Sequence, residues 1–487
     1  MNRFVLTFII TFASGLLFGK QSGTIQNRID EILRTVPYST KYGVMVYNPL
    51  TKDTLYQRNI TAPIKPASNT KLFTTGAAFS LLGGDYQLST KLFTEDENIS
   101  DGVINGNLYI KGFGNSLFTD RDIDIMVSQL ISMGIRRVTG KIIGDDSYFD
   151  DMYHRRDWID EATNDALPPV SAIVINRNRI QFNISPAPKA GGRVGFNFTP
   201  YSSLIKVRSN ARTGRGRTRI SISQSYSSNN YEFVISGTLK RKSRAIWYSA
   251  EIKNPPLFAA FLLQDKLQRS GISVSLKPGQ GETPANVNEL TARSVSLREL
   301  SKIINKHSDN FLAECLYKTV GAAFSHNQGN SFYATQAISD FLNRNNIYSE
   351  STMINDGSGL SHSNQVTAGG IVSLLEKIYF NPLLFSDYYN SLSIAGVDGT
   401  LRNRMIGTAA ENNFHGKTGT LNGVIALSGY LTVKGRPDLI VSIIFEYEKG
   451  SPHHYRYLED QIIASLAGTE TLVQKELPED APDLENQ

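Results

Sequence analysis

The sequence predicts a protein of mixed α and β structure that divides into two or three domains. Its 487 residues are too many for one ordinary hydrophobic core. Helical and strand patterns are mixed in residues 23–165 and again in residues 255–447. Between these parts, residues 166–244 contain short runs in which apolar and polar side chains alternate, as in β-strands with one wet face. We therefore expect an α+β protein with a mainly β segment in its middle.

The stretch at residues 66–84 predicts a helix with reactive groups in its first turn. Phe73, Ala77 and Leu81 recur at the spacing of one helix face, and Gly83 with Gly84 supplies a stop signal. Ser68 and Lys71 are three residues apart, so a hydroxyl and an amine can share a proton on one face. The helix N-terminus also favours a developing oxyanion. This pattern indicates an activated serine.

The remaining elements are bounded by their periodicity and by turn residues. Helices are expected over residues 25–36, 122–133, 255–271, 297–305 and 311–320. Strands are expected over residues 42–47, 91–93, 103–110, 138–143, 424–433 and 439–447, with the second and third forming a hairpin. A glycine-rich loop is expected at residues 356–361.

The charge of the chain is unevenly distributed. Residues 166–244 contain fourteen Lys or Arg and one acidic residue, Glu232. Because the whole chain carries +5 and this segment carries +13, the rest carries −8. A solvated basic face explains this pattern, and so does a surface that docks to an anionic polymer or lipid surface of the cell envelope. Nucleic acid is not expected as a partner, because no binding motif is present.

The N-terminus predicts export. Arg3 precedes an apolar run at residues 4–18, which is shorter than the roughly 20 residues that span a bilayer. Residues 1–20 are therefore interpreted as a cleaved signal peptide, with an uncleaved anchor as the alternative. Residues 469–487 are acidic and are expected to be disordered. The single cysteine, Cys315, forms no internal disulfide, and the histidines show no metal-binding spacing, so no metal or cofactor is expected.

Ser-x-x-Lys is a short pattern, and on its own a surface serine that caps a helix explains it equally well. Two later stretches change this interpretation, namely Ser308-Asp309-Asn310 and Lys417-Thr418-Gly419-Thr420. The order of the three motifs resembles that of penicillin-binding proteins and serine β-lactamases.

The resemblance is closest to the class C low-molecular-mass penicillin-binding proteins, the D-alanyl-D-alanine carboxypeptidase/endopeptidase family. Matching runs lie at residues 66–75, 106–112, 140–149, 305–314, 357–361, 395–401 and 417–421. His362 and Ser393 stand where the family more often has Arg and Pro. Both residues are expected to touch loops rather than the catalytic residues, so they leave details of substrate recognition open.

The resemblance implies a penicillin-binding-protein or β-lactamase-like catalytic domain that is split by nested insertions. The expected division is a catalytic domain (21–88 and 290–468), an inserted α+β domain (89–165 and 245–289) and a basic β-rich accessory domain (166–244). It also implies an exported, periplasmic enzyme that acts on peptidoglycan peptides and is inhibited covalently by β-lactams. Peripheral membrane association and the oligomeric state are left open by the sequence.

The resemblance further implies a role for each motif residue. Ser68 is expected to attack the carbonyl carbon, and Lys71 to act as its base, which requires its ordinary pKa of ~10.4 to fall by about three units. Ser308 and Asn310 are expected to relay the proton and to bind the substrate amide. Lys417, Thr418, Gly419 and Thr420 are expected to bind the terminal carboxylate. A β-lactamase or esterase on the same scaffold and a catalytically decayed wall-binding module are the alternatives.

Overall fold

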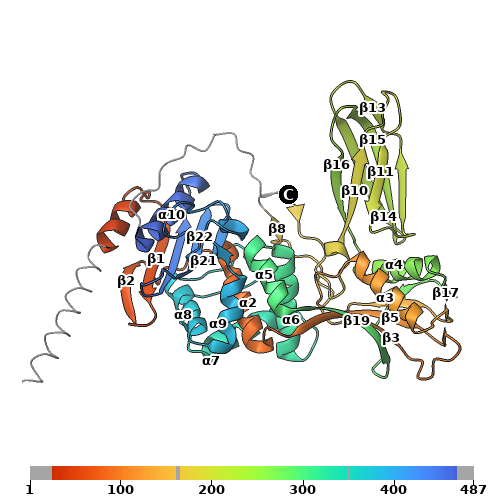
Figure 1. The fold of residues 1–487 in the computed structure, drawn as a ribbon, viewed down its shortest axis with the longest axis horizontal. Coiled ribbons are helices and arrows are strands. Elements are labelled where there is room, and N and C mark those ends of the chain that lie inside the picture. Colours follow the sequence, from red (N-terminus) through yellow and green to blue (C-terminus); the bar gives the residue numbers. More distant parts are fainter. Residues whose placement is uncertain (1–24, 161–164, 349, 469–487) are drawn as a thin grey trace, which may run out of the picture.

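The computed structural model describes residues 25–160, 165–348 and 350–468. They form two bodies joined by two long antiparallel strands, β3 (Gln87–Thr94) and β19 (Asn288–Ser296), as Figure 1 shows. The expected signal peptide and acidic tail lie outside the described residues. Within the described ranges, no helix is both long and apolar enough to cross a membrane.

The first body is built on a six-stranded antiparallel sheet. Its strands, in spatial order, are β2 (Asp53–Arg58), β1 (Lys41–Asn48), β23 (Leu439–Glu446), β22 (Val424–Leu431), β21 (Phe414–Leu421) and β20 (Ser393–Ile394). Strand β1 pairs with β23, which lies about 400 residues later. The sheet therefore forms only when the two ends of the described chain meet. The expected strands at residues 42–47, 424–433 and 439–447 are confirmed as β1, β22 and β23.

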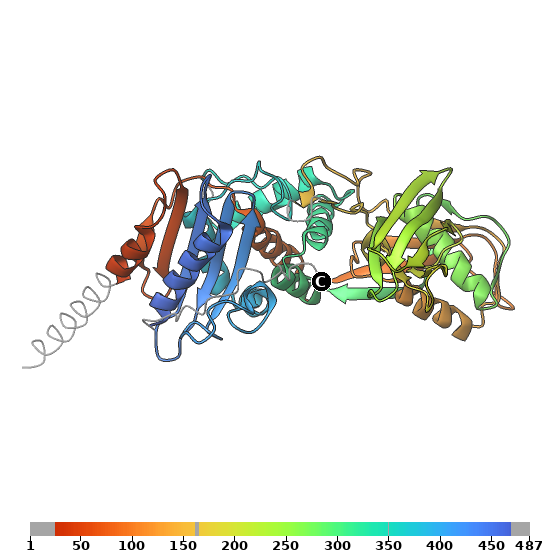
Figure 2. The same ribbon diagram turned by 90° about the horizontal axis from the view of Figure 1, so that it is seen from above.

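Helices cover both faces of this sheet (Figures 1 and 2). On one face, the helix at residues 25–33 and α10 (Pro452–Ala467) share a core with alternate sheet residues such as Val44 and Ile425. The other face is covered by a bundle that includes Leu72 and Phe73 in its core. The bundle comprises α2 (Thr70–Leu82), α5 (Leu297–His307), α6 (Asn310–Ser325), α7 (Ser331–Arg344), α8 (Ala368–Tyr379) and α9 (Pro382–Ser391).

Helix α2 confirms the predicted reactive helix but differs from it in burial. It ends at Gly83, as expected, and Phe73 and Ala77 are buried. Leu81, the third member of the predicted apolar stripe, is 44% exposed, whereas every residue from Thr70 to Phe79 is buried. The reason is that α2 lies at the centre of the bundle, so its first three turns are enclosed on all sides and only its last turn reaches solvent.

The second body begins with a five-stranded sheet onto which two helices pack. Its strands are β18 (Gly279–Gln280), β7 (Ile142–Asp145), β5 (Leu108–Phe113), β3 and β19. Helices α3 (Asp120–Ser132) and α4 (Pro255–Arg269) share a core with these strands through Ile110, Ile142 and Phe258. Small ladders join β17 (Ser273–Val274), β6 (Arg137–Val138) and β4 (Val103–Ile104), and β8 (Ile159–Asp160) with β9 (Asp165–Ala166).

Two strand predictions in this body are wrong in detail. Residues 103–110 do not form one hairpin strand, because β3 pairs with β5 whereas β4 lies in a separate small sheet. Residues 138–143 likewise split into β6 and β7. The cause is a bond across the two breaks, where the Gly140 N–H donates to the Gly106 carbonyl at 2.8 Å. On one side of this bond β4 pairs with β6, and on the other side β5 pairs with β7, so both segments pass from one sheet to the other at the same point.

The basic segment folds as two packed sheets that stand out from the rest of the molecule (Figure 1). One sheet has the order β11 (Gly195–Thr199), β10 (Arg179–Ser185), β16 (Ile246–Glu251). In the other, β15 (Asn230–Lys240) pairs with β12 (Ile205–Ser209), β13 (Arg212–Gly214) and β14 (Arg219–Ser227). Phe182 and Phe233 meet between the sheets, with ring centroids 4.6 Å apart.

Strand pairing bears on the edges of the expected domains. Strand β16 lies beyond residue 244 yet pairs with β10 of the basic segment, and β19 extends past residue 290 while pairing with β3. The division of the chain into domains stays a prediction, and these pairings favour edges a few residues later at both points.

Candidate active site

Ser68 lies in a short 3₁₀ turn (Ala67–Asn69) that leads directly into α2. The preceding residue, Ala67, has a φ of +47°, a left-handed conformation that is unusual for a residue with a side chain. Tight packing holds the turn in place, since it contacts both β21 and β22 of the sheet. Ser68 is half-buried, whereas Lys71 one turn later is fully buried. The sheet and the helix bundle together thus position the reactive turn.

The Lys71 amine is held by three oxygen atoms. Its Nζ lies 2.9 Å from Ser68 Oγ, 2.7 Å from Asn310 Oδ1 and 2.6 Å from the Ser358 carbonyl oxygen. The amide and backbone oxygens can only accept, so each takes one N–H from the amine. A neutral amine that makes those two bonds directs its lone pair at the Ser68 hydroxyl. The geometry therefore suits the removal of a proton from Ser68 Oγ.

Ser308 and Asn310 lie where the chain passes from α5 to α6. Ser308 ends α5 with a φ of +55°, and Asp309 caps α6 by accepting the Leu312 N–H at 2.9 Å. Asn310 is the first residue of α6, so its amide oxygen reaches Lys71. Asp309 also forms an ion pair with Arg177 from the start of the basic segment. The inserted chain thus touches the second motif directly.

The third motif lies on β21, next to an edge that β20 covers only at His415 and Gly416. Lys417 is buried, and its Nζ donates to Ser308 Oγ at 2.8 Å. Thr418 Oγ1 donates to Thr400 Oγ1 at 2.8 Å, and exposed Thr420 accepts from Arg456 Nη2 at 3.3 Å. Gly419 is buried in the strand. The motif therefore lies along the part of β21 that β20 leaves uncovered.

The structure thus joins the predicted residues in two contact groups. Ser68, Lys71 and Asn310 form one group, and Lys417 with Ser308 forms the other. Helix α6 begins two residues after Ser308, and β21 packs on the turn that carries Ser68, so the groups adjoin. Among the described residues, no group of three or more His, Cys, Asp or Glu could hold a metal ion.

Sequence reasoning missed three contributors to this site. The Ser358 carbonyl, Thr400 and Arg456 all contact the predicted residues. The sequence shows that the loop at residues 356–361 is glycine-rich. It does not show which backbone oxygen of the loop contacts Lys71, because every residue has the same carbonyl group. Arg456 lies in α10, where nothing near it in the sequence distinguishes it from any other helix arginine.

His415 is buried two residues before Lys417. Its ring stacks on Tyr389, with centroids 4.0 Å apart and an interplanar angle of 16°. Burial lowers the pKa of His415 to about 4, since the charged ring would lose its water. His415 is therefore neutral near pH 7 and packs against Tyr389 beside the third motif.

Comparisons with known proteins find relatives over most of the chain. The model of the D-Ala-D-Ala carboxypeptidase 3 (S13) family matches residues 25–466. A D-alanyl-D-alanine carboxypeptidase of Actinomadura sp. (strain R39) is 29% identical over 405 residues, covering 80% of this chain and 74% of that protein. The D-alanyl-D-alanine carboxypeptidase DacB of Haemophilus influenzae is 26% identical over 434 residues, covering 87% and 89%.

A solved structure shares the fold. The crystal structure of penicillin binding protein 4 from Haemophilus influenzae superposes with a TM-score of 0.73 at 24% identity, covering 90% of this chain and 98% of that one. A second crystal structure of that protein, complexed with a β-lactam, gives a TM-score of 0.71. The expected fold class, an α/β penicillin-binding-protein-like catalytic domain with inserted accessory parts, is confirmed.

We predict that Gly359→Ala disrupts the site. Gly359 has a φ of +90°, and a Cβ there would lie 1.9 Å from the Ala67 carbonyl oxygen. Either the loop or the turn that carries Ser68 must then move, and a displacement of about 1 Å can cost about 10²-fold in rate. The measurement is the rate at which Ser68 is acylated by a β-lactam. Gly83→Ala is the matched control, because its φ is +77° but nothing lies within 4 Å of its Cβ.

We also predict that His415 makes the fold sensitive to acid. The pKa of His415 is about 4 in the folded protein and 6.5 when unfolded, so the unfolded chain binds more protons between these values. Stability is therefore lost as the pH falls from 6.5 towards 4, by about 2 kcal/mol between pH 7 and pH 5. Urea unfolding at both pH values measures this loss. His415→Phe, which keeps the stack on Tyr389, should lose less, and an equal loss would contradict the prediction.

Proposed function

This chain belongs to the D-Ala-D-Ala carboxypeptidase 3 (S13) family, and we propose that it cleaves the D-Ala-D-Ala end of peptidoglycan stem peptides through an acyl-enzyme on Ser68. The family match covers residues 25–466, and curated D-alanyl-D-alanine carboxypeptidases match most of the chain. The chain is accordingly a serine-type D-Ala-D-Ala carboxypeptidase. The contacts of the Lys71 amine with Ser68, Asn310 and Ser358 support the assignment of Ser68 and Lys71 within it.

In the acylation step, Ser68 Oγ attacks the carbonyl carbon of the D-Ala-D-Ala bond while Lys71 takes its proton. The backbone N–H groups of Ser68 and Thr420 are the proposed donors to the resulting oxyanion, and losing one such donor typically costs about 10²–10³ in rate. The C–N bond then breaks, and Ser308 relays the proton to the departing D-alanine nitrogen. Its 2.8 Å contact with Lys417 Nζ supports this role, because it fixes the hydroxyl.

In the second step, water attacks the ester carbon and the C–O bond to Ser68 breaks. Ser68 regains its proton, and the shortened peptide leaves as a carboxylic acid. Asn310 has a double role in this scheme, since its amide oxygen accepts from Lys71 and its amide nitrogen can bind the substrate carbonyl.

Recognition of a free D-Ala end follows from the charge on β21. Lys417 with the Thr418 and Thr420 hydroxyls is the proposed site for the terminal carboxylate. Gly419 lets this strand pack closely on the turn that carries Ser68, because a Cβ there would lie 2.8 Å from the Pro66 carbonyl oxygen. Arg456 adds a second cation beside Thr420, at 3.3 Å from its hydroxyl. A cation and hydroxyl donors together suit a carboxylate better than a neutral amide. This arrangement favours carboxypeptidase activity on chain ends.

Two further proposals follow from this substrate. Peptidoglycan lies outside the cytoplasmic membrane, so we infer that the chain is exported and acts in the periplasm, with residues 1–20 as its signal. β-Lactams mimic the D-Ala-D-Ala end, so they are expected to acylate Ser68. Related proteins support this, since a penicillin binding protein 4 from Haemophilus influenzae has been crystallised with a β-lactam.

The basic segment supplies a separate candidate binding surface. Its cations gather at one end of the two sheets. There, the backbones of Arg193 and Arg212 form an isolated β-bridge, and Gly214 of β13 lies opposite Lys240 of β15. This end, which we call the basic tip, projects away from the helix bundle in Figure 1, around β13. The basic tip comprises Lys189, Arg193, Arg212, Arg215, Arg217, Lys240, Arg241, Lys242 and Arg244.

We propose that the basic tip docks to an anionic polymer of the cell envelope. The single acidic residue of the segment, Glu232, lies near the start of β15, at the opposite end from Lys240. In the strand register it is opposite Lys206 of β12 and Ser225 of β14. The tip therefore has the charge complementary to a polyanion, with no acid of its own segment to neutralise it. Attraction of this kind would hold the enzyme at its polymeric substrate.

The acyl-enzyme prediction is tested by labelling with a fluorescent penicillin and by mass mapping of the labelled peptide. We expect the adduct on Ser68, its loss in Ser68→Ala, and a rate about 10²–10⁴-fold lower in Lys71→Ala, because a general base is missing. Lys65→Ala is a control for the loss of a lysine, since Lys65 pairs with Glu446 at 3.1 Å. Normal labelling of Lys71→Ala at neutral pH would contradict the role of Lys71. Rapid release of the label would favour a β-lactamase, and no label at all a decayed binding module.

The docking prediction is tested by sedimentation of the full chain with the soluble polyanion alginate and with anionic lipid vesicles. We expect binding to alginate that weakens steeply as salt rises. Substituting Arg215, Arg217 and Arg241 by Gln should weaken it further, whereas Gln at Arg28, Arg136 and Arg137, outside the segment, should not. Binding that ignores salt, or binding to vesicles alone, would refute the proposal.

A further inference from the structure

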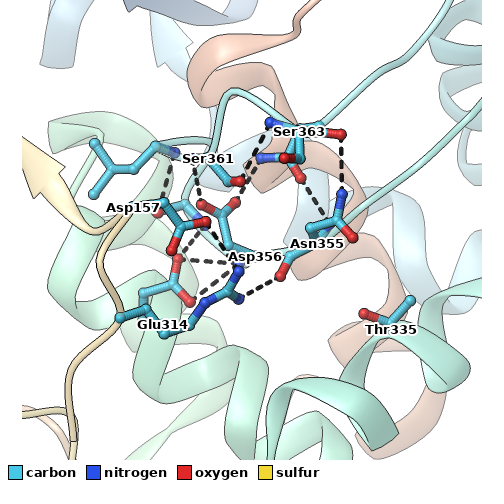
Figure 3. Close-up of polar contacts among 12 residues, drawn as sticks. Asp157, Glu314, Thr335, Asn355, Asp356, Ser361 and Ser363 are labelled. Carbon is cyan, nitrogen blue, oxygen red and sulfur yellow. Dashed lines mark hydrogen bonds and ion pairs between the residues drawn. The ribbon is translucent and has the colours of Figure 1, made fainter.

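Two carboxylates are buried behind the Lys71 amine, and the mechanism above gives them no role. Glu314 lies one turn after Asn310 on α6, and Asp356 opens the loop that carries Ser358. Both side chains have no exposed surface. Figure 3 shows Asp356 among Glu314, Asp157 and Ser361. Charges so deeply buried need hydrogen-bond partners, and the loop supplies them from its backbone.

The loop presents its N–H groups to these two carboxylates. Asp356 Oδ1 accepts from the Gly359 N–H at 2.8 Å, and its Oδ2 accepts from the Ser361 N–H at 2.7 Å. Glu314 Oε1 accepts from the Ser358 N–H at 2.8 Å and from the Gly357 N–H at 3.1 Å. Four N–H groups of one short loop thus face the same two acids.

The carbonyl groups of the same peptide units face α2 instead. The Ser358 carbonyl accepts from Lys71 Nζ at 2.6 Å, and the Gly357 carbonyl accepts from Thr74 Oγ1 at 2.9 Å. The peptide unit between Ser358 and Gly359 therefore links Lys71 to Asp356. The preceding unit links Thr74 to Glu314 in the same way. Each unit connects a donor on the reactive helix to one buried carboxylate.

We propose that Asp356 is a positioning residue for Lys71: through the Ser358–Gly359 peptide unit it fixes the amine and sets how readily the amine gives up its proton. A carboxylate bonded to the N–H end of a peptide polarises its carbonyl oxygen, which then attracts N–H donors more strongly. The proposal rests on the assignment of Lys71 as the base for Ser68.

The connections explain why Asp356, rather than Glu314, acts on Lys71, because only Asp356 binds the N–H of the peptide unit whose carbonyl contacts the amine. Burial, followed by the negative charge of Asp356, raises the pKa of Glu314 and so favours its neutral form. Tyr317 on α6 is also neutral, because burial raises its pKa. From the inserted body, Arg155 donates to the Asn355 carbonyl at 2.6 Å and pairs with Asp157 at 3.0 Å.

The test is the rate of Ser68 acylation by a β-lactam, measured against pH in the full chain. The rate falls on the acid side because Lys71 must be neutral to accept a proton. In Asp356→Asn, the negative charge behind the amine is gone, so protonated Lys71 is less favoured. We expect this acid limb to move to lower pH by about one unit. An acid limb that stays in place while only the maximal rate falls would reduce Asp356 to a structural role.

A second variant has the opposite expected sign. Asn364 Nδ2 donates at 2.7 Å to the same Asp356 oxygen that binds Gly359. In Asn364→Ala, that oxygen relies on the Gly359 N–H alone, so protonated Lys71 is favoured and the acid limb should move to higher pH. A shift to lower pH, or none, would overturn the proposal even if Asp356→Asn did not fold, because mere loosening of the loop gives no defined sign.

Glu459→Gln is the matched control for damage to a buried acid. Glu459 is fully buried on α10, pairs with Arg404 at 2.9 Å, and has a pKa raised to about 8 by burial. Its replacement should lower stability and leave the acid limb in place. The wild-type profile separates the two proposals. If a β-lactam does not label the wild type, the acyl-enzyme itself is rejected. If the wild type is labelled but the acid limb stays in place in both variants, only the role of Asp356 is rejected.

Discussion

The site depends on one buried amine that is held between three oxygen atoms. Lys71 Nζ contacts Ser68, Asn310 and Ser358, which belong to the 3₁₀ turn, to α6 and to the loop at residues 356–361. A lysine with no exposed surface is costly unless its N–H groups are bonded or it is neutral. The three contacts meet the first condition, and the proposed role of Lys71 as a base requires the second. The bonds to Asn310 and Ser358 offset the cost of burying the amine. In a neutral amine they also use both N–H groups, so the nitrogen lone pair faces Ser68.

The architecture serves to bring those three segments together. Helix α2 lies inside the bundle, so the amine has packed neighbours on every side and cannot reach water. The sheet fixes the other half of the site, because β21 packs on the turn that carries Ser68 and also supplies Lys417. Strand β1 pairs with β23, so segments about 400 residues apart in the chain must pair to complete the sheet that carries Lys417.

The inserted body is connected to the site as well as to the chain. It leaves the first body through β3 and returns through β19, which pair along their length. Arg177 pairs with Asp309 of the second motif, and Arg155 reaches the backbone beside Asp356. Arg177 thereby contacts the residue before Asn310, and Arg155 contacts the residue before Asp356. The insertion thus contacts the segments that carry the proposed site residues, while its basic tip projects away from the helix bundle.

From the sequence alone, the reactive helix, the strands β22 and β23, and the order of the three motifs could be predicted. The helix and the strands depend on neighbours within a few residues, where periodicity and Gly83 as a stop signal are sufficient. The motifs and their order are visible directly in the chain. Packing between distant segments explains why Leu81 is exposed, why residues 103–110 are divided between two sheets, and why the Ser358 carbonyl and Arg456 contact the predicted site residues. Those outcomes depend on backbone groups and on contacts between segments tens to hundreds of residues apart. The spacing of residues along the sequence does not predict such contacts, because they form only when distant segments pack together.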